Sequence, residues 1–475
     1  MAGMAGMAGM AGAGGLSAAV AACAPRPRRA VGGHALSAPD AGAPVLVVVA
    51  LADLHSSHER HAQLLARIDR TLAEHRGLPA LIAINGDLFE RGNVVALRDE
   101  GALDLALVAA LAARAPVVFN LGNHEGALFD VADAARRLER AGAAVVTSIG
   151  DRRTGAPMAP TRATMRAGGL RVGVVGVATS DLATYRAAVR EPLVVPDSTS
   201  ALLDAHRALR TPDDADVVLL LSHDGVVHDR ATLARLDDGA LLIGAHDHLR
   251  FTHRAGRTLY VHGGHWGAAY ATIVARRTPD GLVWSHASVP VPLDGPRDPS
   301  FAARVARVRE RWLEPADLAV VGRAARSYEP REAAALAVAA VREAARVDVA
   351  LVGNTTFGAG LARGAVTRFD LDALVRFDGP VLRAEVDGAT LRTILARADQ
   401  DDDVPLAART GEFLVSAGGA TPLDDARTYR VATNAWTVAS AANARRYLGT
   451  EALAFAPVDG LALKAVVAAR LAAGG

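Results

Sequence analysis

The stretch VLVVVALADLH, residues 45–55, joins an unbroken apolar run to Asp53 and His55. A short continuous run rich in valine is typical of a strand that is buried on both faces in layered α/β structure. In open α/β sheets, ligands bind beyond the carboxyl ends of the strands. We therefore expect Asp53 and His55 to lie at a functional site where this strand ends.

Four further apolar runs end in polar residues in the same way. Each predicted strand is followed by its own polar group: Asp87 after Ala80–Asn85, Asn123 and His124 after Pro116–Asn120, His223 after Val217–Ser222, and His246 and His248 after Ala240–Gly244. Five loops are therefore expected to bring carboxylate, imidazole and amide groups to one edge of the sheet.

The chemical types in this set indicate the metals that it suits. Two carboxylates, one carboxamide and four imidazoles favour transition metals such as Mn, Fe, Co, Ni or Zn over Ca. Seven groups are too many for one ion that keeps a position open for substrate, but they divide well between two ions about 3.5–4 Å apart if one carboxylate bridges. His246 and His248 would alternate sides in an extended segment, so each is expected to serve a different ion.

Apolar periodicity and proline content set the expected organisation of the chain. Buried-strand runs alternate with helical stretches such as Arg60–Arg76, which predicts α/β layers. Prolines across residues 289–300 mark a linker, followed by a helix at Phe301–Leu313. We predict a first domain at 44–290, a linker and helix at 291–314, and a second domain at 315–475. Residues 150–168 are expected to form an exposed loop.

Composition excludes several classes of protein. The chain has 475 residues, of which 51% are hydrophobic, and a formal net charge of +1. These values exclude a disordered chain and give no charge pattern for nucleic-acid binding. The single cysteine, Cys23, excludes an internal disulfide framework and a thiolate zinc site. We expect no transmembrane span beyond the ambiguous N-terminus.

Residues 1–43 are expected to be a leader outside the fold. The segment Val20-Ala21-Ala22-Cys23 resembles a bacterial lipobox, which would place a lipid anchor on Cys23 and the protein in the periplasm or cell envelope. However, no Lys or Arg precedes the apolar part, as an export signal requires. The alternative is that the protein is cytoplasmic and that these residues are a flexible leader or result from a wrongly assigned start codon.

The remaining histidines carry a weaker signal. His58 and His61 stand three residues apart on the first predicted helix and are expected to lie on a solvated face. The others are interpreted as surface or core residues: His228, His253, His262, His265 and His286.

Together, the five loop motifs resemble the calcineurin-like metallophosphoesterase superfamily. Later segments narrow the resemblance to the two-domain bacterial 5′-nucleotidase family: Leu351–Asn354, Val366-Thr367, Arg376–Gly379, Val386–Leu391 and Tyr429–Asn434. The resemblance implies a β-sandwich flanked by helices, in four αββα layers, and a smaller α/β C-terminal substrate domain.

Site roles are also implied by this resemblance. One divalent ion would be held by Asp53, His55, Asp87 and His248, and the other by Asp87, Asn123, His223 and His246, with Asp87 bridging. A hydroxide between the ions would attack the phosphorus in line. His124 would stabilise the transition state or protonate the leaving oxygen.

The chain departs from the family pattern at three places. The family places Phe-Asp close behind Asn-His-Glu, whereas three residues precede Phe129-Asp130 in this chain, so Glu125 and Asp130 both stay candidates for orienting His124. The glycine-rich loop ending in Ile-Arg is replaced by residues 353–358, which contain Asn354, and the nearest arginine is Arg363.

The third departure concerns substrate recognition. Phe377 fits the first of the two rings that clamp a base in the family, but the motif that brings the second ring is missing from residues 436–447, where Trp436 stands. Because each ring stacked on a base contributes about 1–3 kcal/mol, we expect weak nucleotide selectivity. Asn354, Phe377 and Trp436 are the candidate substrate-binding residues.

The expected function is hydrolysis of a small phosphate ester, nucleotides included, by a dinuclear metal-dependent enzyme. One alternative is an enzyme on the same scaffold that resembles the thiosulfonate hydrolases of sulfur oxidation. The other alternative is a metal-bound binding protein without catalytic turnover. A substrate panel combined with metal analysis distinguishes the three.

Overall fold

The computed structural model describes residues 42–209, 214–400, 404–419 and 422–474. The leader at 1–43 and its Cys23 lie outside the described residues, apart from Gly42 and Ala43, where the first strand begins. In these described ranges, no helix has both the length and the apolar character needed to cross a bilayer.

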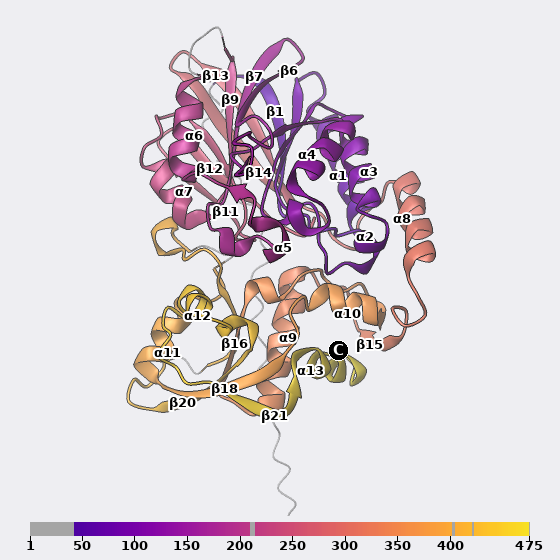
Figure 1. The fold of residues 1–475 in the computed structure, drawn as a ribbon, viewed down its shortest axis with the longest axis vertical. Coiled ribbons are helices and arrows are strands. Elements are labelled where there is room, and N and C mark those ends of the chain that lie inside the picture. Colours follow the sequence, from indigo (N-terminus) through magenta and orange to yellow (C-terminus); the bar gives the residue numbers. More distant parts are fainter. Residues whose placement is uncertain (1–41, 210–213, 401–403, 420–421, 475) are drawn as a thin grey trace, which may run out of the picture. The chain divides into compact units, whose positions relative to one another are not determined.

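Two six-stranded sheets form the first part of the chain (Figure 1). The first sheet has the order β14 (Gly281–Pro290), β13 (Ala269–Thr278), β1 (Ala43–Leu51), β2 (Ala80–Asn85), β3 (Val117–Asn120), β4 (Ala143–Val146). The second has the order β11 (Arg250–Ala255), β12 (Thr258–Gly263), β10 (Leu241–Gly244), β9 (Val217–His223), β7 (Leu170–Ala178), β6 (Arg162–Ala167).

Strand β1 shows how the layers are assembled. Leu46, Val48 and Ala50 pack with residues of β7 and β9 in the core between the two sheets. The alternate residues Val49 and Leu51 pack instead against the helix side of the first sheet. Both faces are buried, as the valine-rich run predicts, and each fully buried Val or Leu contributes about 1.5–3 kcal/mol.

Helices cover the outer faces of both sheets (Figure 1). The first sheet is covered by α1 (His61–Glu74), α3 (Ala102–Ala112) and α4 (Val131–Arg140), and the second by α6 (Ser198–Arg207) and α7 (Val226–Leu233). The order of the layers is helix, sheet, sheet, helix. The predicted four-layer αββα class is therefore confirmed.

Helix α8 (Pro299–Trp312) follows the proline-rich segment, close to its predicted position. Its N-cap residue, Asp298, accepts a hydrogen bond from the Phe301 amide at 2.9 Å, and Pro299 occupies the first turn. This combination fixes where the helix begins after the linker.

The C-terminal part contains a second α/β unit. Its five-stranded sheet has the order β19 (Leu414–Gly418), β16 (Val349–Gly353), β20 (Thr428–Asn434), β18 (Pro380–Asp387), β21 (Ala456–Ala462), and β15 (Val320–Ala324) pairs with β17 (Gly364–Thr367). Its helices are α9 (Pro330–Ala345), α10 (Arg368–Leu374), α11 (Gly388–Leu395), α12 (Ala441–Leu448) and α13 (Leu463–Ala472). Helices α9 and α13 contact each other and pack their apolar faces in one core with β16.

The expected exposed loop at 150–168 is wrong in part. Residues Arg162–Ala167 form β6, an edge strand that pairs antiparallel with β7. The exposure of β6 alternates along its length, so its arginines face solvent while the neighbouring positions are partly covered. Arginine and threonine on an exposed edge gave this strand the composition of a loop.

The solvated face expected for His58 and His61 is also wrong. Their exposed fractions are 2% and 0%, because α3 and α8 pack against this region; His61 begins α1, whereas His58 lies in the turn before it. His58 Nε2 lies 3.2 Å from the carboxylate of Asp104, a fully buried residue of α3. The Asp104 carboxylate also accepts a hydrogen bond from Ser56 Oγ at 2.9 Å. These contacts tie the loop after β1 to α3.

Asp104→Asn should lower the stability of the metal-free protein in a pH-dependent way. Although burial lowers it, the Asp104 carboxylate raises the pKa of His58 above its usual value. The ion pair therefore contributes fully below about pH 6.5 and is lost as pH rises through the raised pKa of His58. Urea unfolding should show a loss of about 3 kcal/mol at pH 6 and a smaller loss at pH 9. An equal loss at both pH values would contradict the ion pair.

Candidate metal centre

The predicted ligands follow strands of both sheets. Asp53, Asp87 and Asn123 come after β1, β2 and β3 of the first sheet, which run parallel to one another. His223 ends β9 and the two remaining histidines follow β10, both in the second sheet. The expectation of one sheet edge is thus corrected: the carboxyl ends of two packed sheets supply the site.

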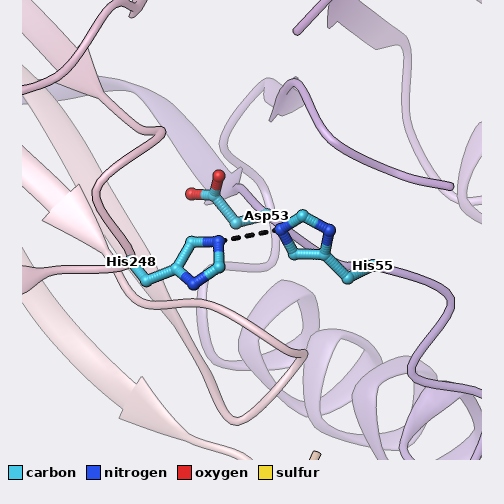
Figure 2. A group of neighbouring side chains, drawn as sticks. All are labelled: Asp53, His55 and His248. Carbon is cyan, nitrogen blue, oxygen red and sulfur yellow. Dashed lines mark hydrogen bonds between the residues drawn. The ribbon is translucent and has the colours of Figure 1, made fainter. Parts of the chain in front are cut away.

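Asp53, His55 and His248 form the first group (Figure 2). Their potential ligand atoms all lie within 4.8 Å of one another, and the Nε2 atoms of the two histidines are 2.8 Å apart. Burial lowers the pKa of His55 to about 3 and that of His248 well below its usual value. Both imidazoles are therefore neutral at pH 7, which is the form that binds metal.

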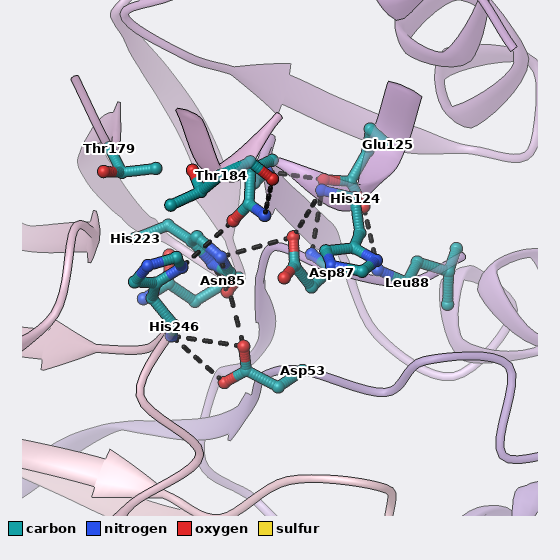
Figure 3. A network of polar contacts seen from close by, with 12 residues as sticks. Asp53, Asn85, Asp87, Leu88, His124, Glu125, Thr179, Thr184, His223 and His246 are labelled. Atoms are coloured by element: carbon teal, nitrogen blue, oxygen red, sulfur yellow. Dashed lines mark hydrogen bonds and ion pairs between the residues drawn. The ribbon is translucent and has the colours of Figure 1, made fainter. Parts of the chain in front are cut away.

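Asp87, His223 and His246 form the second group, again within 4.8 Å (Figure 3). His246 Nδ1 lies 3.0 Å from Oδ1 of Asn123. The Asn123 side-chain nitrogen donates to the carbonyl of Thr184 at 3.2 Å, so the carboxamide oxygen is the atom that faces this group. The structure thus brings all seven predicted ligands into two adjoining sets.

Asp87 lies between the two groups. Its Oδ1 is 3.3 Å from His223 Nε2, and its Oδ2 is 3.9 Å from His55 Nε2. One carboxylate oxygen therefore faces each group, which is the arrangement that a bridging ligand requires. The Oδ1 atom also accepts a hydrogen bond from the backbone amide of His124 at 2.8 Å.

His223 provides a test of whether the site fits a cation. Its Nδ1 donates to the carbonyl of Asn85 at 2.8 Å, which leaves Nε2 as the ligand atom. That Nε2 is buried without hydrogen-bond geometry to any described residue. Although burial lowers it, the carboxylates of Asp87 and Asp53 raise the pKa of His223 to about 10. Two buried carboxylates that draw a positive charge onto His223 in the metal-free protein form a site that fits divalent ions, which would supply that charge instead.

The backbone around the ligands is strained. Positive φ angles occur at Asp53 (50°), His55 (46°), Asp87 (57°), His246 (83°) and His248 (57°). Such conformations cost about 1–3 kcal/mol each and persist where the surroundings enforce them. The two histidines after β10 therefore do not lie in an extended segment, and the predicted alternation is wrong. Left-handed turns direct them into different groups instead.

Glu125 and Asp130, the two candidates for orienting His124, both bind backbone amides. The buried Glu125 carboxylate accepts hydrogen bonds from the amides of Leu88 at 2.8 Å and Gly122 at 2.5 Å. It thereby holds together the loops after β2 and β3, while burial and the nearby Asp87 raise its pKa to about 7. Asp130 caps α4 by accepting from the amide of Ala132 at 2.9 Å.

Glu90 and Arg376 are neighbours of the site that the sequence interpretation missed. Glu90 Oε2 lies 3.5 Å from His55 Nδ1 and forms an ion pair with Arg376, whose side chain is buried. Arg363, the arginine nearest to the altered loop in sequence, is exposed. Two sequence signals were available: Glu90 stands three residues after Asp87, and Arg376 directly precedes the candidate ring Phe377.

Of the three candidate substrate-binding residues, two are rings that stack on each other and the third binds backbone groups. Phe377 and Trp436 stack on each other, with ring centroids 4.1 Å apart and planes at 14°. The two rings are therefore in direct contact, and a base would have to separate them to enter between them. Asn354 is engaged with backbone: it accepts from the amide of Phe413 at 3.0 Å and donates to the carbonyl of Asp247 at 3.2 Å.

Gly122→Ala should weaken metal binding by at least about 10-fold. An added Cβ would lie 2.3 Å from Asp87 Oδ1 and 2.8 Å from the His223 ring, so both side chains would have to move. Calorimetric titration of the metal-free protein with Mn²⁺ measures the effect. Gly169→Ala is the matched control, because nothing lies within 4 Å of its added Cβ. Equal affinity in the two variants would contradict the assignment of Asp87 and His223 as ligands.

Two family models match the chain, one on each side of the linker. The model for calcineurin-like phosphoesterases matches residues 46–250, and that for the 5′-nucleotidase C-terminal domain matches residues 315–446. A sequence search among curated proteins finds no match.

Solved structures share the fold at low sequence identity. A 5′-nucleotidase precursor from Thermus thermophilus has 18% identity and a TM-score of 0.57, covering 90% of this chain and 96% of its own. The sulfate thiohydrolase SoxB of Thermus thermophilus, in complex with glycerol, has 18% identity and a TM-score of 0.61, covering 91% and 95%. A 5′-nucleotidase from Candida albicans has 12% identity and a TM-score of 0.53, covering 91% and 98%.

The two family matches cover the site-bearing sandwich and the C-terminal unit in the order seen in 5′-nucleotidases. The chain therefore belongs to the calcineurin-like phosphoesterases that carry a 5′-nucleotidase C-terminal domain, a group of metal-dependent hydrolases.

Proposed function

We propose that the chain is a two-metal phosphoesterase that hydrolyses a small phosphate ester. The observation that carries this proposal is the position of Asp87, whose two oxygens face separate groups of histidines. The first ion would be held by Asp53, His55, Asp87 and His248, and the second by Asp87, Asn123, His223 and His246. When bound, the two ions would supply an activated water and offset negative charge on the phosphoryl group.

His124 is the group proposed to protonate the leaving oxygen. Its amide is bonded to Asp87, and its ring lies edge-on to that of His55 with centroids 4.8 Å apart. Its side chain is 27% exposed, whereas those of His55 and His223 are 1% and 0% exposed, so a substrate can reach His124. A partly exposed imidazole beside the reacting phosphorus suits general acid catalysis.

The proposed substrate is a small ester, because the closed ring pair leaves no gap for a base. Phe377 and Trp436 stack with ring centroids 4.1 Å apart, so a base could bind between them only after the two rings separate. We also propose that Phe377, Trp436 and Asn354 contact the substrate. Because the sulfate thiohydrolase SoxB shares the fold, a thiosulfonate is the second substrate class to include in a screen.

Asp87→Asn and His246→Ala should each abolish hydrolysis of 4-nitrophenyl phosphate by the Mn²⁺-loaded protein while the fold is retained. The reason is that Asn is a poorer bridging ligand than a carboxylate, and Ala removes a ligand of the second ion. Activity, metal content and far-UV circular dichroism should be measured together, and a chelator should abolish the wild-type activity.

His253→Ala is the matched control for this experiment, since His253 lies on β11 outside both ligand groups. Full activity in Asp87→Asn or His246→Ala would contradict the assignment of that residue as a metal ligand. A wild type that binds two ions but hydrolyses no phosphomonoester, diester, nucleotide or thiosulfonate would favour the binding-protein alternative.

Trp436→Ala should change kcat/KM for adenosine monophosphate and for glycerol phosphate by the same factor, within about threefold. This result is expected if the ring pair forms a wall beside a small ester and receives no base. A loss confined to the nucleotide and larger than about 10-fold would show instead that the rings separate and clamp a base. Steady-state kinetics on both esters decides between the two outcomes.

A further inference from the structure

We propose that Tyr185 is a positioning residue for the second metal ion, acting through a loop that decides which end of the Asn123 carboxamide faces that ion. The inference rests on the proposed function, because it takes Asn123 as a ligand of the second ion. Thr184 lies beside the second group (Figure 3), and its carbonyl accepts a hydrogen bond from Asn123 Nδ2 at 3.2 Å. At the other end of the carboxamide, Oδ1 lies 3.0 Å from His246 Nδ1.

A carboxamide ligand differs from a carboxylate because only one of its two ends can bind a cation. Its oxygen carries lone pairs, whereas its nitrogen presents two N–H donors. If the Asn123 carboxamide turned by 180°, those donors would face the ion and the oxygen would face the carbonyl oxygen of Thr184. The Thr184 carbonyl therefore favours the orientation in which Oδ1 faces the second group, as hydrogen-bond partners of metal ligands commonly do.

Two hydrogen bonds hold the Thr184 carbonyl in place by closing residues 179–185 into a compact loop. Thr184 Oγ1 donates to the carbonyl of Asp181 at 2.7 Å. The hydroxyl of Tyr185 donates to the carbonyl of Thr179 at 2.8 Å, which joins the last residue of the loop to its first. The shape of this loop therefore depends on a single phenolic hydroxyl at its end.

Tyr185 also anchors the loop in the protein core. It is 2% exposed and packs in the helix-side core of the first sheet, together with Ala127 and Val131, which follow Asn123 in the chain. The Thr184 carbonyl belongs to the planar peptide that enters Tyr185, so the position of the tyrosine fixes the direction of that carbonyl. Removing the hydroxyl keeps the packing of the ring but releases the other end of the loop.

Tyr185→Phe tests the proposal because it removes the hydroxyl and keeps the ring. The affinity of the second ion is measured by calorimetric titration with Mn²⁺ of His248→Ala, which lacks a ligand of the first ion. In this background we expect Tyr185→Phe to weaken Mn²⁺ binding at least about fivefold, since losing a direct partner of a ligand typically costs about 10–100-fold. Unchanged affinity would overturn the proposal.

Tyr270→Phe is the matched control. Tyr270 is buried in the same core, and its hydroxyl also donates to a backbone carbonyl, that of Arg67 at 3.0 Å. Because this bond reaches α1 rather than the loop beside Asn123, Tyr270→Phe should change the Mn²⁺ affinity of His248→Ala by less than about twofold. An equal loss in the two variants would show a general effect on packing and would overturn the proposal.

Asn123→Asp separates positioning of the carboxamide from a general structural role of Tyr185. A carboxylate presents an oxygen at both ends, so its orientation no longer depends on the Thr184 carbonyl. In His248→Ala protein that also carries Asn123→Asp, adding Tyr185→Phe should change the Mn²⁺ affinity by less than about twofold. A loss as large as the one measured with Asn123 in place would overturn the proposal.

Hydrogen exchange in the metal-free protein gives a test that does not involve metal binding. The side-chain amide of Asn123 is identified in a ¹H–¹⁵N spectrum by its absence in Asn123→Asp. We expect its protons to exchange with deuterium at least about fivefold faster in Tyr185→Phe than in the wild type, because the bond to the Thr184 carbonyl is weakened. Equal exchange rates would overturn the proposal. A His248→Ala protein that binds no Mn²⁺ would contradict the two-site assignment in the proposed function, and the exchange rates would still decide the role of Tyr185.

Discussion

A buried carboxylate shared between two sets of imidazoles is the interaction on which the rest of the structure depends. Asp87 cannot be ionised in the protein interior unless positive charge surrounds it, and His223 supplies part of that charge in the metal-free protein. The glycines at 86 and 122 leave room for the side chains that meet there. Glu125 then clamps the backbone of both loops. The β-sandwich thus buries an ionised carboxylate among imidazoles, an arrangement that lowers stability when no cation is bound.

The strands and the gathering of the candidate ligands could be predicted because their signals are local. A valine-rich run is recognisable in the sequence as a strand buried on both faces, and Asp53 and Asp87 each follow such a run within two residues. The burial of His58 and His61 could not be predicted, because it depends on α3 and α8, which are distant in sequence. The position of Glu90 was missed for the same reason: the fold alone brings it beside His55 and Arg376, which are distant in sequence.

Two polar contacts connect described residues of the C-terminal unit to the candidate centre. Asn354 donates to the carbonyl of Asp247, which lies between the two histidines after β10, and Arg376 pairs with Glu90. Both contacts join the C-terminal unit to residues beside the candidate ligands.

Anomalous diffraction from crystals soaked in Mn²⁺ tests the shared carboxylate most directly. We predict two strong peaks about 3.5–4 Å apart, with the carboxylate of Asp87 between them. A single peak, or a pair of peaks that does not share Asp87, would contradict the two-metal centre.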